Sequence, residues 1–369
     1  MNQLFRWDQM GLFLLALAAG ILPFAVPEVC AAALREGLTL CSGPLLLSLF
    51  PFLVVSRLLI QCPESDLLAL PFRLAAWGIG IRTPCAARVL CIGFLGGFAP
   101  AASAAAQAVR TGQLTAEEAD ALLPACICSG PSFVVLTVGQ SLLGSAELGV
   151  LLFASQITAN YLTAALLNRF AGVRSVKPGS AAPASPAPPR LDEILADAAI
   201  TYCKLCGFIL FFRMLAAGAG ALLPAGAGTL CAILLEVCSG CDLASRTGRW
   251  GSLLCCAALS VQGLSVLLQV RTICPPEMTL RPLYRARMLH LPLSLALFYL
   301  LLPGGEADVF STLPARVLLM RRVPPDCALL VFAVCCMAAC TLRSGIRQVE
   351  QKQMARNAGG CCINSKTLL

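Results

Sequence analysis

Long runs of apolar residues dominate this chain and set what it can fold into. Most approach the roughly 20 residues that a helix needs to cross a bilayer. Of the 369 residues, 58% are hydrophobic and only 12% are charged, whereas a soluble domain has about 25% charged residues. The cores of the apolar runs lie at 10–26, 38–60, 86–108, 124–143, 147–168, 203–223, 228–244, 251–270, 284–303 and 326–342. We therefore predict an all-α polytopic membrane protein with about 8–10 hydrophobic helical segments.

Basic residues outside the apolar runs predict the orientation. Residues 169–190 hold four basic residues and no acid, and the tail after Leu342 holds five against Glu350 alone. Lys and Arg accumulate in cytoplasmic loops, so both regions are expected in the cytoplasm. Five apolar runs lie between them, but a return to the same side needs an even number of crossings. We expect one run to be a broken or re-entrant helix, which membranes tolerate where protein or water satisfies its backbone.

A segment rich in Pro, Ala and Ser divides the chain into two parts of similar length. Such composition favours an extended, flexible linker. The first apolar run is followed by Pro27 and Glu28 instead of a small-residue cleavage site, so we expect a retained helix. The predicted parts are a transmembrane helix in 1–37, a first half in 38–170, the cytoplasmic linker 171–190, a second half in 191–303, a loop and last transmembrane helix in 304–342, and a basic cytoplasmic tail in 343–369.

The two halves contain similar segments in the same order. Residues 50–59 align with 206–215 and place Arg57 opposite Arg213. Residues 94–97 then align with 236–240, and 129–136 align with 262–269. Paired hydrophobic segments interrupted by Gly or Pro are typical of secondary transporters, which bind solute at such interruptions near the middle of the bilayer. We interpret the pattern as a duplicated, transporter-like arrangement.

Polar and helix-breaking residues inside these segments form the candidate substrate site. A break at Ser129-Gly130-Pro131 would turn nearby polar groups toward a cavity instead of lipid. Close helix packing through Gly and Ser is the competing interpretation, and for the glutamines it is hydrogen bonding between helices. The candidate residues are Ser129, Gly130, Ser132, Gln140, Glu236, Gln262, Gly263, Ser265 and Gln269.

Charged residues inside apolar runs cost free energy to bury. Glu236 lies in such a run, where a carboxylate must be paired or face water. It is either a functional group or one member of an ion pair with Arg213 or Arg57. We expect both arginines to lie near helix ends and to extend their charged groups to the lipid headgroups. An anion site is the competing interpretation of these two residues.

Enzymatic chemistry is not expected. His290 is the only histidine, and we predict that it makes a structural hydrogen bond; no nucleophile–base pair or metal-binding pattern is evident. Two Cys-x-x-Cys pairs, at 203–206 and 238–241, are attributed to chance, because the chain holds 21 cysteines. We predict no cofactor and no metal. The basic residues are spread through loops, so no nucleic-acid binding is predicted either.

A short charged helix is predicted at 115–123. Thr115 followed by Glu118 has the spacing of a capping box. Acids in the first turn also interact favourably with the helix dipole. We expect Glu117, Glu118 and Asp120 to face water, as on a solvated connector. Residues 191–197 are predicted to form an amphipathic lead-in at the membrane surface.

Several of these motifs together resemble a known family. They are the run Gly93–Pro100, the helix at 115–123, Cys128–Phe133 with Gly139, Leu234–Gly240, Gln262–Ser265 with Gln269, and Arg287–His290. Over about residues 40–303 the chain is similar to the nucleoside-recognition, or Gate, domain of the sporulation integral membrane protein YlbJ family. The resemblance implies a role in endospore formation, in a membrane of the mother cell or around the forespore.

Two functions follow from this resemblance and from the interrupted segments. In the first, the protein binds or passes a small polar solute, such as a nucleoside, at its broken helices. In the second, it is a membrane scaffold that organises sporulation proteins without transport. The expected partners are membrane lipids, together with that solute or those proteins. No oligomeric state is predicted.

Overall fold

The computed structural model describes residues 2–171 and 191–302, and this part of the chain is helical. It contains fourteen α-helices. The predicted linker from residue 172, the last transmembrane helix in 304–342 and the basic tail lie outside the described residues.

The part before the linker begins with three helices in close succession. Pro27, Pro44 and Pro84 each open a helix, a position where the missing N–H of proline costs nothing. The elements are α1 (Asn2–Ala25), α2 (Pro27–Ser42), α3 (Pro44–Gln61), η1 (Pro63–Asp66), α4 (Leu70–Gly78), α5 (Pro84–Gly96), α6 (Phe98–Arg110), α7 (Ala116–Cys126), the π-helix η2 (Ser132–Leu142) and α8 (Ala146–Ala171).

The part after the linker begins with the longest helix described, of 32 residues. The predicted lead-in at 191–197 is the first part of this helix and not a separate element. The elements are α9 (Leu191–Leu222), α10 (Ala225–Leu235), α11 (Val237–Ser245), η3 (Gly248–Trp250), α12 (Gly251–Val261), α13 (Gly263–Ile273) and α14 (Arg281–Leu301).

Four helical stretches are long and apolar enough to cross a membrane. They are Pro27–Leu47, Ala146–Ala171, Leu191–Leu222 and Gly248–Ile273. Shorter apolar helices accompany them, at Phe13–Ala25, Leu49–Gln61, Pro84–Gly96, Ser132–Leu142 and Ala225–Leu235. The prediction of an all-α protein with several candidate membrane spans is therefore confirmed. The first of these spans includes residues 37 and 38, between which the N-terminal helix and the first half were predicted to divide.

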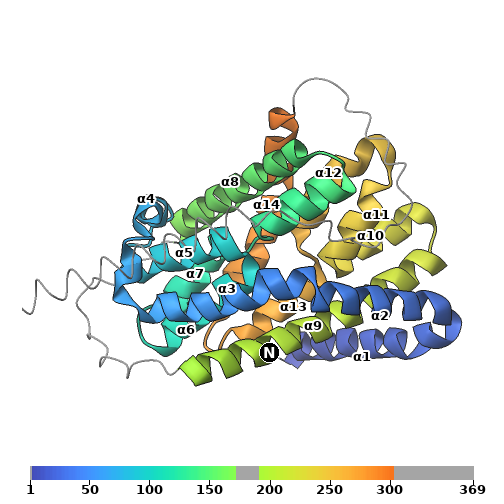
Figure 1. The fold of residues 1–369 in the computed structure, drawn as a ribbon, viewed down its shortest axis with the longest axis horizontal. Helices are drawn as coiled ribbons and strands as arrows, with labels where there is room; N and C mark the ends of the chain where they lie inside the picture. Colours follow the sequence, from blue (N-terminus) through green and yellow to red (C-terminus); the bar gives the residue numbers. More distant parts are fainter. Residues whose placement is uncertain (1, 172–190, 303–369) are drawn as a thin grey trace, which may run out of the picture.

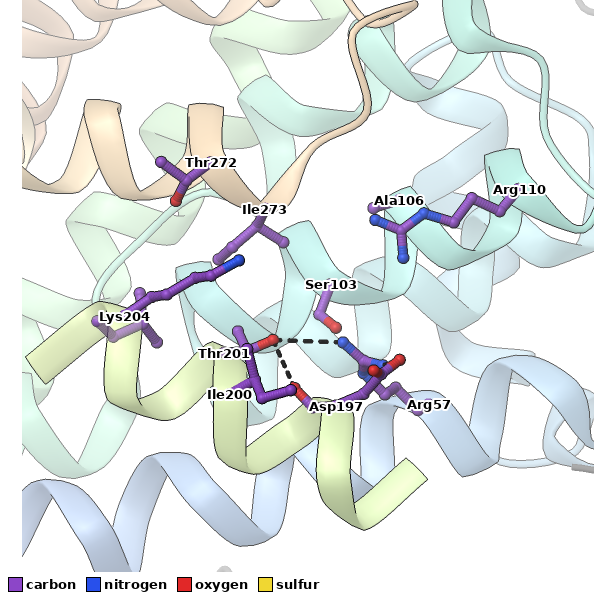
Figure 2. Close-up of a pocket in the computed structure, with 11 residues that line it drawn as sticks. Arg57, Ser103, Ala106, Arg110, Asp197, Ile200, Thr201, Lys204, Thr272 and Ile273 are labelled. Atoms are coloured by element: carbon purple, nitrogen blue, oxygen red, sulfur yellow. Dashed lines mark hydrogen bonds and ion pairs between the residues drawn. The ribbon is translucent and has the colours of Figure 1, made fainter. Parts of the chain in front are cut away.

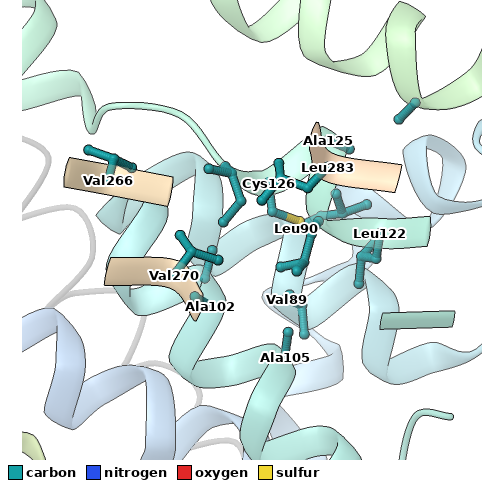
Figure 3. Packing of buried hydrophobic residues seen from close by; sticks show 14 of the residues in the cluster. Val89, Leu90, Ala102, Ala105, Leu122, Ala125, Cys126, Val266, Val270 and Leu283 are labelled. Carbon is teal, nitrogen blue, oxygen red and sulfur yellow. The ribbon is translucent and has the colours of Figure 1, made fainter. Parts of the chain in front are cut away.

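α1, α2 and α9 lie along one side of the molecule, and α8 and α12 lie along the opposite side (Figure 1). α2 and α3 follow one another along α9, and α8 packs against η2 and α14 on the side of the molecule away from α1. The largest apolar core lies among α5, α6, α7, α13 and α14, where Leu90, Ala105, Leu122 and Val270 meet (Figure 3). Seven of the thirteen residues of α6 are alanine, all buried, and such small side chains let helices approach closely.

The charged helix α7 corrects one expectation. Its capping box is present, with the Thr115 hydroxyl accepting from the Glu118 amide. Glu117 is exposed, but Glu118 and Asp120 are buried. The Glu118 carboxylate accepts from the Thr83 hydroxyl at 2.6 Å. The expectation of a solvated connector was wrong, because neighbouring loops supply hydrogen bonds to these acids.

Candidate site at four helix interruptions

Four apolar stretches are interrupted and then resume as helix. α5 gives way to α6 at Gly97, and α10 to α11 at Glu236. α12 gives way to α13 at Gln262, and the stretch between α7 and η2 leaves the helix around Ser129 and Gly130. α12 and α13 have 11 residues each, so each rises about 16 Å, about half of the ~30 Å hydrocarbon core. The interruption at Gln262 therefore falls near the middle of an apolar stretch.

Two interruptions in the first half touch one another. Gly97 has φ +80° and ψ −163°, a region of backbone conformation that is essentially restricted to glycine. A Cβ atom on Gly97 would lie 2.7 Å from the amide nitrogen of Gly130. The end of α5 therefore meets the backbone just before η2 without any side chain between them.

The two interruptions in the second half are arranged in the same way. Gly263 has φ +67°, and a Cβ there would lie 2.9 Å from the amide nitrogen of Glu236. Gln262 also has a positive φ, +65°, which is uncommon for a residue with a side chain and is found most often at functional sites. The ends of α10 and α12 therefore meet in direct backbone contact.

A hydrogen bond connects the two pairs of interruptions. The Gln262 side-chain amide donates to the Ser129 hydroxyl at 3.2 Å and to the Leu259 carbonyl at 2.6 Å. Ser129 and Gln262 are both buried. Residues 133 positions apart thus bring all four interruptions into one cluster, which we call the interruption cluster and define by Gly97, Ser129–Gly130, Glu236 and Gln262–Gly263.

Glu236 is held by the start of the helix that follows it. Its backbone is extended, and its carboxylate accepts from the Cys238 amide at 2.8 Å, the Ser239 amide at 2.7 Å and the Ser239 hydroxyl at 2.9 Å. The side chain is only 2% exposed. A carboxylate at a helix N-terminus is stabilised both by these donors and by the helix dipole.

Of the two interpretations of Glu236, the ion pair with Arg213 or Arg57 is not formed. Arg213 pairs with Glu36 at 2.7 Å, and Arg57 pairs with Asp197. Because backbone amides already satisfy Glu236, no cation is needed beside it. Both arginine side chains are largely buried, with 14% and 10% exposure, and their reach to the lipid headgroups stays a prediction.

A small cavity of about 70 Å³ lies against the interruption cluster. Its polar lining comes from Ser129, Gly130, Ser132, Glu236 and Gln269. Apolar side chains of α3, α5, η2, α9 and α13 form the remaining wall, among them Phe52, Phe133, Ile209 and Val266. A pocket that is mostly apolar with a few convergent polar groups is the usual form of a small-molecule site.

Two buried amide oxygens at the cluster have no hydrogen-bond partner. They are Oε1 of Gln262 and Oε1 of Gln269, on side chains that are 1% and 2% exposed. The other amide atom of Gln269 donates to the Ser265 hydroxyl at 2.9 Å. A buried acceptor without a donor costs about 1–3 kcal/mol, so both oxygens would be stabilised by a ligand that brings hydrogen-bond donors.

Eight of the nine predicted site residues belong to this region. Five line the cavity, as given above, and Gln262, Gly263 and Ser265 lie directly behind that lining. Gln140 lies apart from them and is exposed. Gln140 follows Gly139, and Gly139 packs closely against Gly149 where η2 contacts α8.

Sequence reasoning missed Arg287 as a member of this region. Arg287 is buried on α14, and its guanidinium donates to the carbonyls of Ile127 and of Ser260 at the ends of α7 and α12. Asn160 donates to the same Ile127 carbonyl at 3.4 Å. An arginine inside an apolar run is the same signal that singled out Glu236, so the sequence did carry it.

The remaining sequence candidates show no catalytic arrangement. His290 is buried and its Nε2 lies 3.2 Å from the Gln156 carbonyl oxygen, as the predicted structural hydrogen bond requires. Within residues 2–171 and 191–302, no group of three or more His, Cys, Asp or Glu side chains could hold a metal ion. The cysteines of both Cys-x-x-Cys pairs are free thiols.

Comparison with protein-family models, with curated proteins and with solved structures finds no match. The fold and its four long apolar helices point to a multi-pass membrane protein. Membership of the sporulation family remains a prediction from the residues that resemble it.

Proposed function

We propose that this protein binds a small polar solute at the interruption cluster and passes it across the membrane. The observation that carries the proposal is the pair of buried, unpartnered glutamine oxygens beside the Glu236 carboxylate, at a cavity where four helix interruptions meet. Non-helical backbone is stable at membrane depth only where protein or water satisfies it. Membrane transporters use this arrangement to expose backbone ends to solute.

The polar groups favour a solute rich in hydrogen-bond donors. Glu236 contributes a carboxylate, and Gln262 and Gln269 contribute acceptor oxygens. Arg287 donates to two backbone carbonyls and does not line the cavity. Arg213 does not line it either and pairs with Glu36. An amine, an ammonium ion or a donor-bearing amide complements this set better than an anion does.

The size of the cavity favours a solute smaller than a nucleoside. Pockets for drug-sized ligands have volumes of roughly 300–1,000 Å³, whereas this cavity has about 70 Å³. A solute of a few heavy atoms fits without rearrangement. A nucleoside, the solute that the family resemblance implies, would require the walls formed by Phe52 and Phe133 to move apart.

The proposed role in endospore formation rests on the family resemblance alone. A duplicated, transporter-like architecture is supported by the positions of the interruptions, because Gly97 and Glu236 belong to one aligned pair of segments, and Ser129 and Gln262 to the other. A scaffold for sporulation proteins would depend on loops and on the tail after residue 342, which lies outside the described residues.

Thermal unfolding of the purified full chain in detergent tests the solute site. The panel contains ammonium, methylammonium, urea, free nucleobases, nucleosides and sodium, measured with the wild type, Glu236→Gln and Gln269→Leu. A ligand at 100 times its dissociation constant adds about 2.7 kcal/mol to the stability of the folded protein. We expect a small donor-bearing solute to raise the melting temperature of the wild type and of neither variant.

The exposed Gln140 provides a matched control. Gln140→Ala should respond to the same solute as the wild type does, because its side chain does not reach the cavity. Stabilisation by nucleosides alone would contradict the size argument. If no member of the panel stabilises a well-folded wild type, the solute site is wrong and the scaffold becomes the better proposal.

A further inference from the structure

A second pocket lies away from the interruption cluster (Figure 2). It has a volume of about 150 Å³ and opens between α3, α6, α9 and α13. Arg110 and Thr272 come from the last turns of α6 and α13, whereas Arg57 comes from α3 and Lys204 from α9. The lining of this pocket shares no residue with that of the cavity described above.

Positive charge predominates in this pocket. Arg57, Arg110 and Lys204 contribute three cations, and Asp197 is the only acid in the lining. The hydroxyls of Ser103, Thr201 and Thr272 also line it. The lining therefore has a formal surplus of two positive charges together with neutral hydrogen-bond donors, which is the composition of an anion site.

One of the three cations is largely buried and already positioned. The Arg57 guanidinium pairs with Asp197 and donates to the Thr201 hydroxyl at 3.3 Å. The residue is only 8% exposed, and its Nε has no hydrogen-bond partner. Asp197, by contrast, is 60% exposed in its side chain. The acid thus lies at the rim and neutralises one cation only.

The other two cations are uncompensated. Neither Arg110 nor Lys204 forms an ion pair within the part of the chain that the structure describes. Figure 2 shows their side chains approaching from opposite sides of the opening, with Ser103 and Arg57 between them. Like charges held around one opening repel each other, and a bound anion would remove that repulsion.

We infer that this pocket binds a phosphate group. Guanidinium groups form paired hydrogen bonds with phosphate oxygens, and lysine acts as a mobile point charge toward the same group. Lys204 lies thirteen residues after the start of α9 at Leu191, on the side of the predicted cytoplasmic linker. Basic pockets between transmembrane helices on that side bind the headgroups of anionic lipids, and free phosphate presents the same chemistry.

Binding measurements on the purified full chain test this site with two probes. The first is inorganic phosphate added in detergent, and the second is a series of nanodiscs made of phosphatidylcholine with or without phosphatidylglycerol. The readout is the shift in melting temperature as each probe is titrated. We expect Arg110→Gln and Lys204→Gln each to weaken the apparent affinity by about fivefold, since a basic residue near an anionic surface contributes about 1 kcal/mol.

Arg285→Gln is the control, because it removes the same charge as Arg110→Gln or Lys204→Gln does. Arg285 is exposed on α14 and does not line the pocket. Suppose that phosphate raises the melting temperature, and that Arg110→Gln and Lys204→Gln weaken this response while Arg285→Gln does not. The site is then supported, and its ligand is the free anion. The same pattern with phosphatidylglycerol alone supports the site and assigns it to a lipid headgroup. If neither probe stabilises the wild type, or if all three variants respond equally, the inference is wrong.

Discussion

Gly97 lies so close to Gly130 that a Cβ atom on Gly97 would stand 2.7 Å from the Gly130 amide nitrogen. The contact joins the interruption between α5 and α6 to the one that precedes η2. Only glycine satisfies both requirements at position 97, which are a positive φ with an extended ψ and the absence of a side chain. The geometry of the interruption cluster therefore depends on this pair.

Replacing Gly97 with alanine should destabilise the protein strongly. The substitution adds backbone strain and forces the Gly130 backbone away, at a combined cost of about 2–4 kcal/mol. Thermal unfolding in detergent measures the effect. Gly80→Ala is the control, because Gly80 also has a positive φ, +88°, but has open space where the Cβ would lie. Equal losses for both variants would show that the contact with Gly130 carries no weight.

Glu236→Gln should lower the stability of the folded protein by about 1–3 kcal/mol, since a neutral amide accepts fewer and weaker hydrogen bonds than a carboxylate. The affected donors are the amides of Cys238 and Ser239. Unfolding by denaturant measures the loss. Glu117→Gln is the control, because Glu117 also lies in the first turn of a helix but is exposed. A stability unchanged by Glu236→Gln would contradict the capping role.

Gln269→Leu should separate stability from solute binding. Leucine removes an amide oxygen that is buried without a partner and also the hydrogen bond to Ser265 at 2.9 Å. The two effects oppose each other, so the stability of the unliganded protein should change by no more than about 1 kcal/mol. The stabilisation by solute should disappear in the same experiment. Gln140→Leu changes the same chemistry at an exposed position and should retain the solute effect. A large loss of stability in Gln269→Leu would indicate a purely structural glutamine.

Arg287→Met should be among the most damaging substitutions in α14. It leaves the carbonyls of Ile127 and Ser260 without their buried donor, at a cost of about 2–5 kcal/mol. Arg287→Lys should lose less, because an ammonium still reaches one carbonyl. Arg285→Met, at an exposed position two residues earlier, should change the melting temperature little. Comparable effects of Arg285→Met and Arg287→Met would contradict this role of the guanidinium.

Much of the interruption cluster could be predicted from the sequence because its residues conflict with their surroundings. Ser129-Gly130-Pro131 breaks an apolar run, and Glu236 and Gln262 place polar groups in others. The structure ends a helix near each of them. The same conflict was present at Arg287 and was not weighed. The internal duplication stays a prediction, although the aligned residues fall at these interruptions.

The partners of these residues could not be predicted in the same way. An ion pair with an arginine was one of the two interpretations of Glu236, because the sequence shows charges but not the free amides at the start of α11. Glu118 and Asp120 were expected in water for a similar reason. Asp120 is satisfied by the amide and hydroxyl of Thr279, 159 positions further on. Contacts between such distant segments depend on tertiary packing, which local spacing does not record.

The winding of η2 determines where this part of the protein can change length. A π-helix places more residues in each turn than an α-helix does, so Ser132–Leu142 is shorter than the same residues would be as an α-helix. Gly149 of α8 lies in close backbone contact with both Gly139 and Val135, so the middle of η2 is held against α8. Only the residues before Val135 are left to rewind toward the α form, and Ser132, which lines the cavity of the proposed solute site, is among them. A change of winding there would move the wall of that cavity while α8 stays in place.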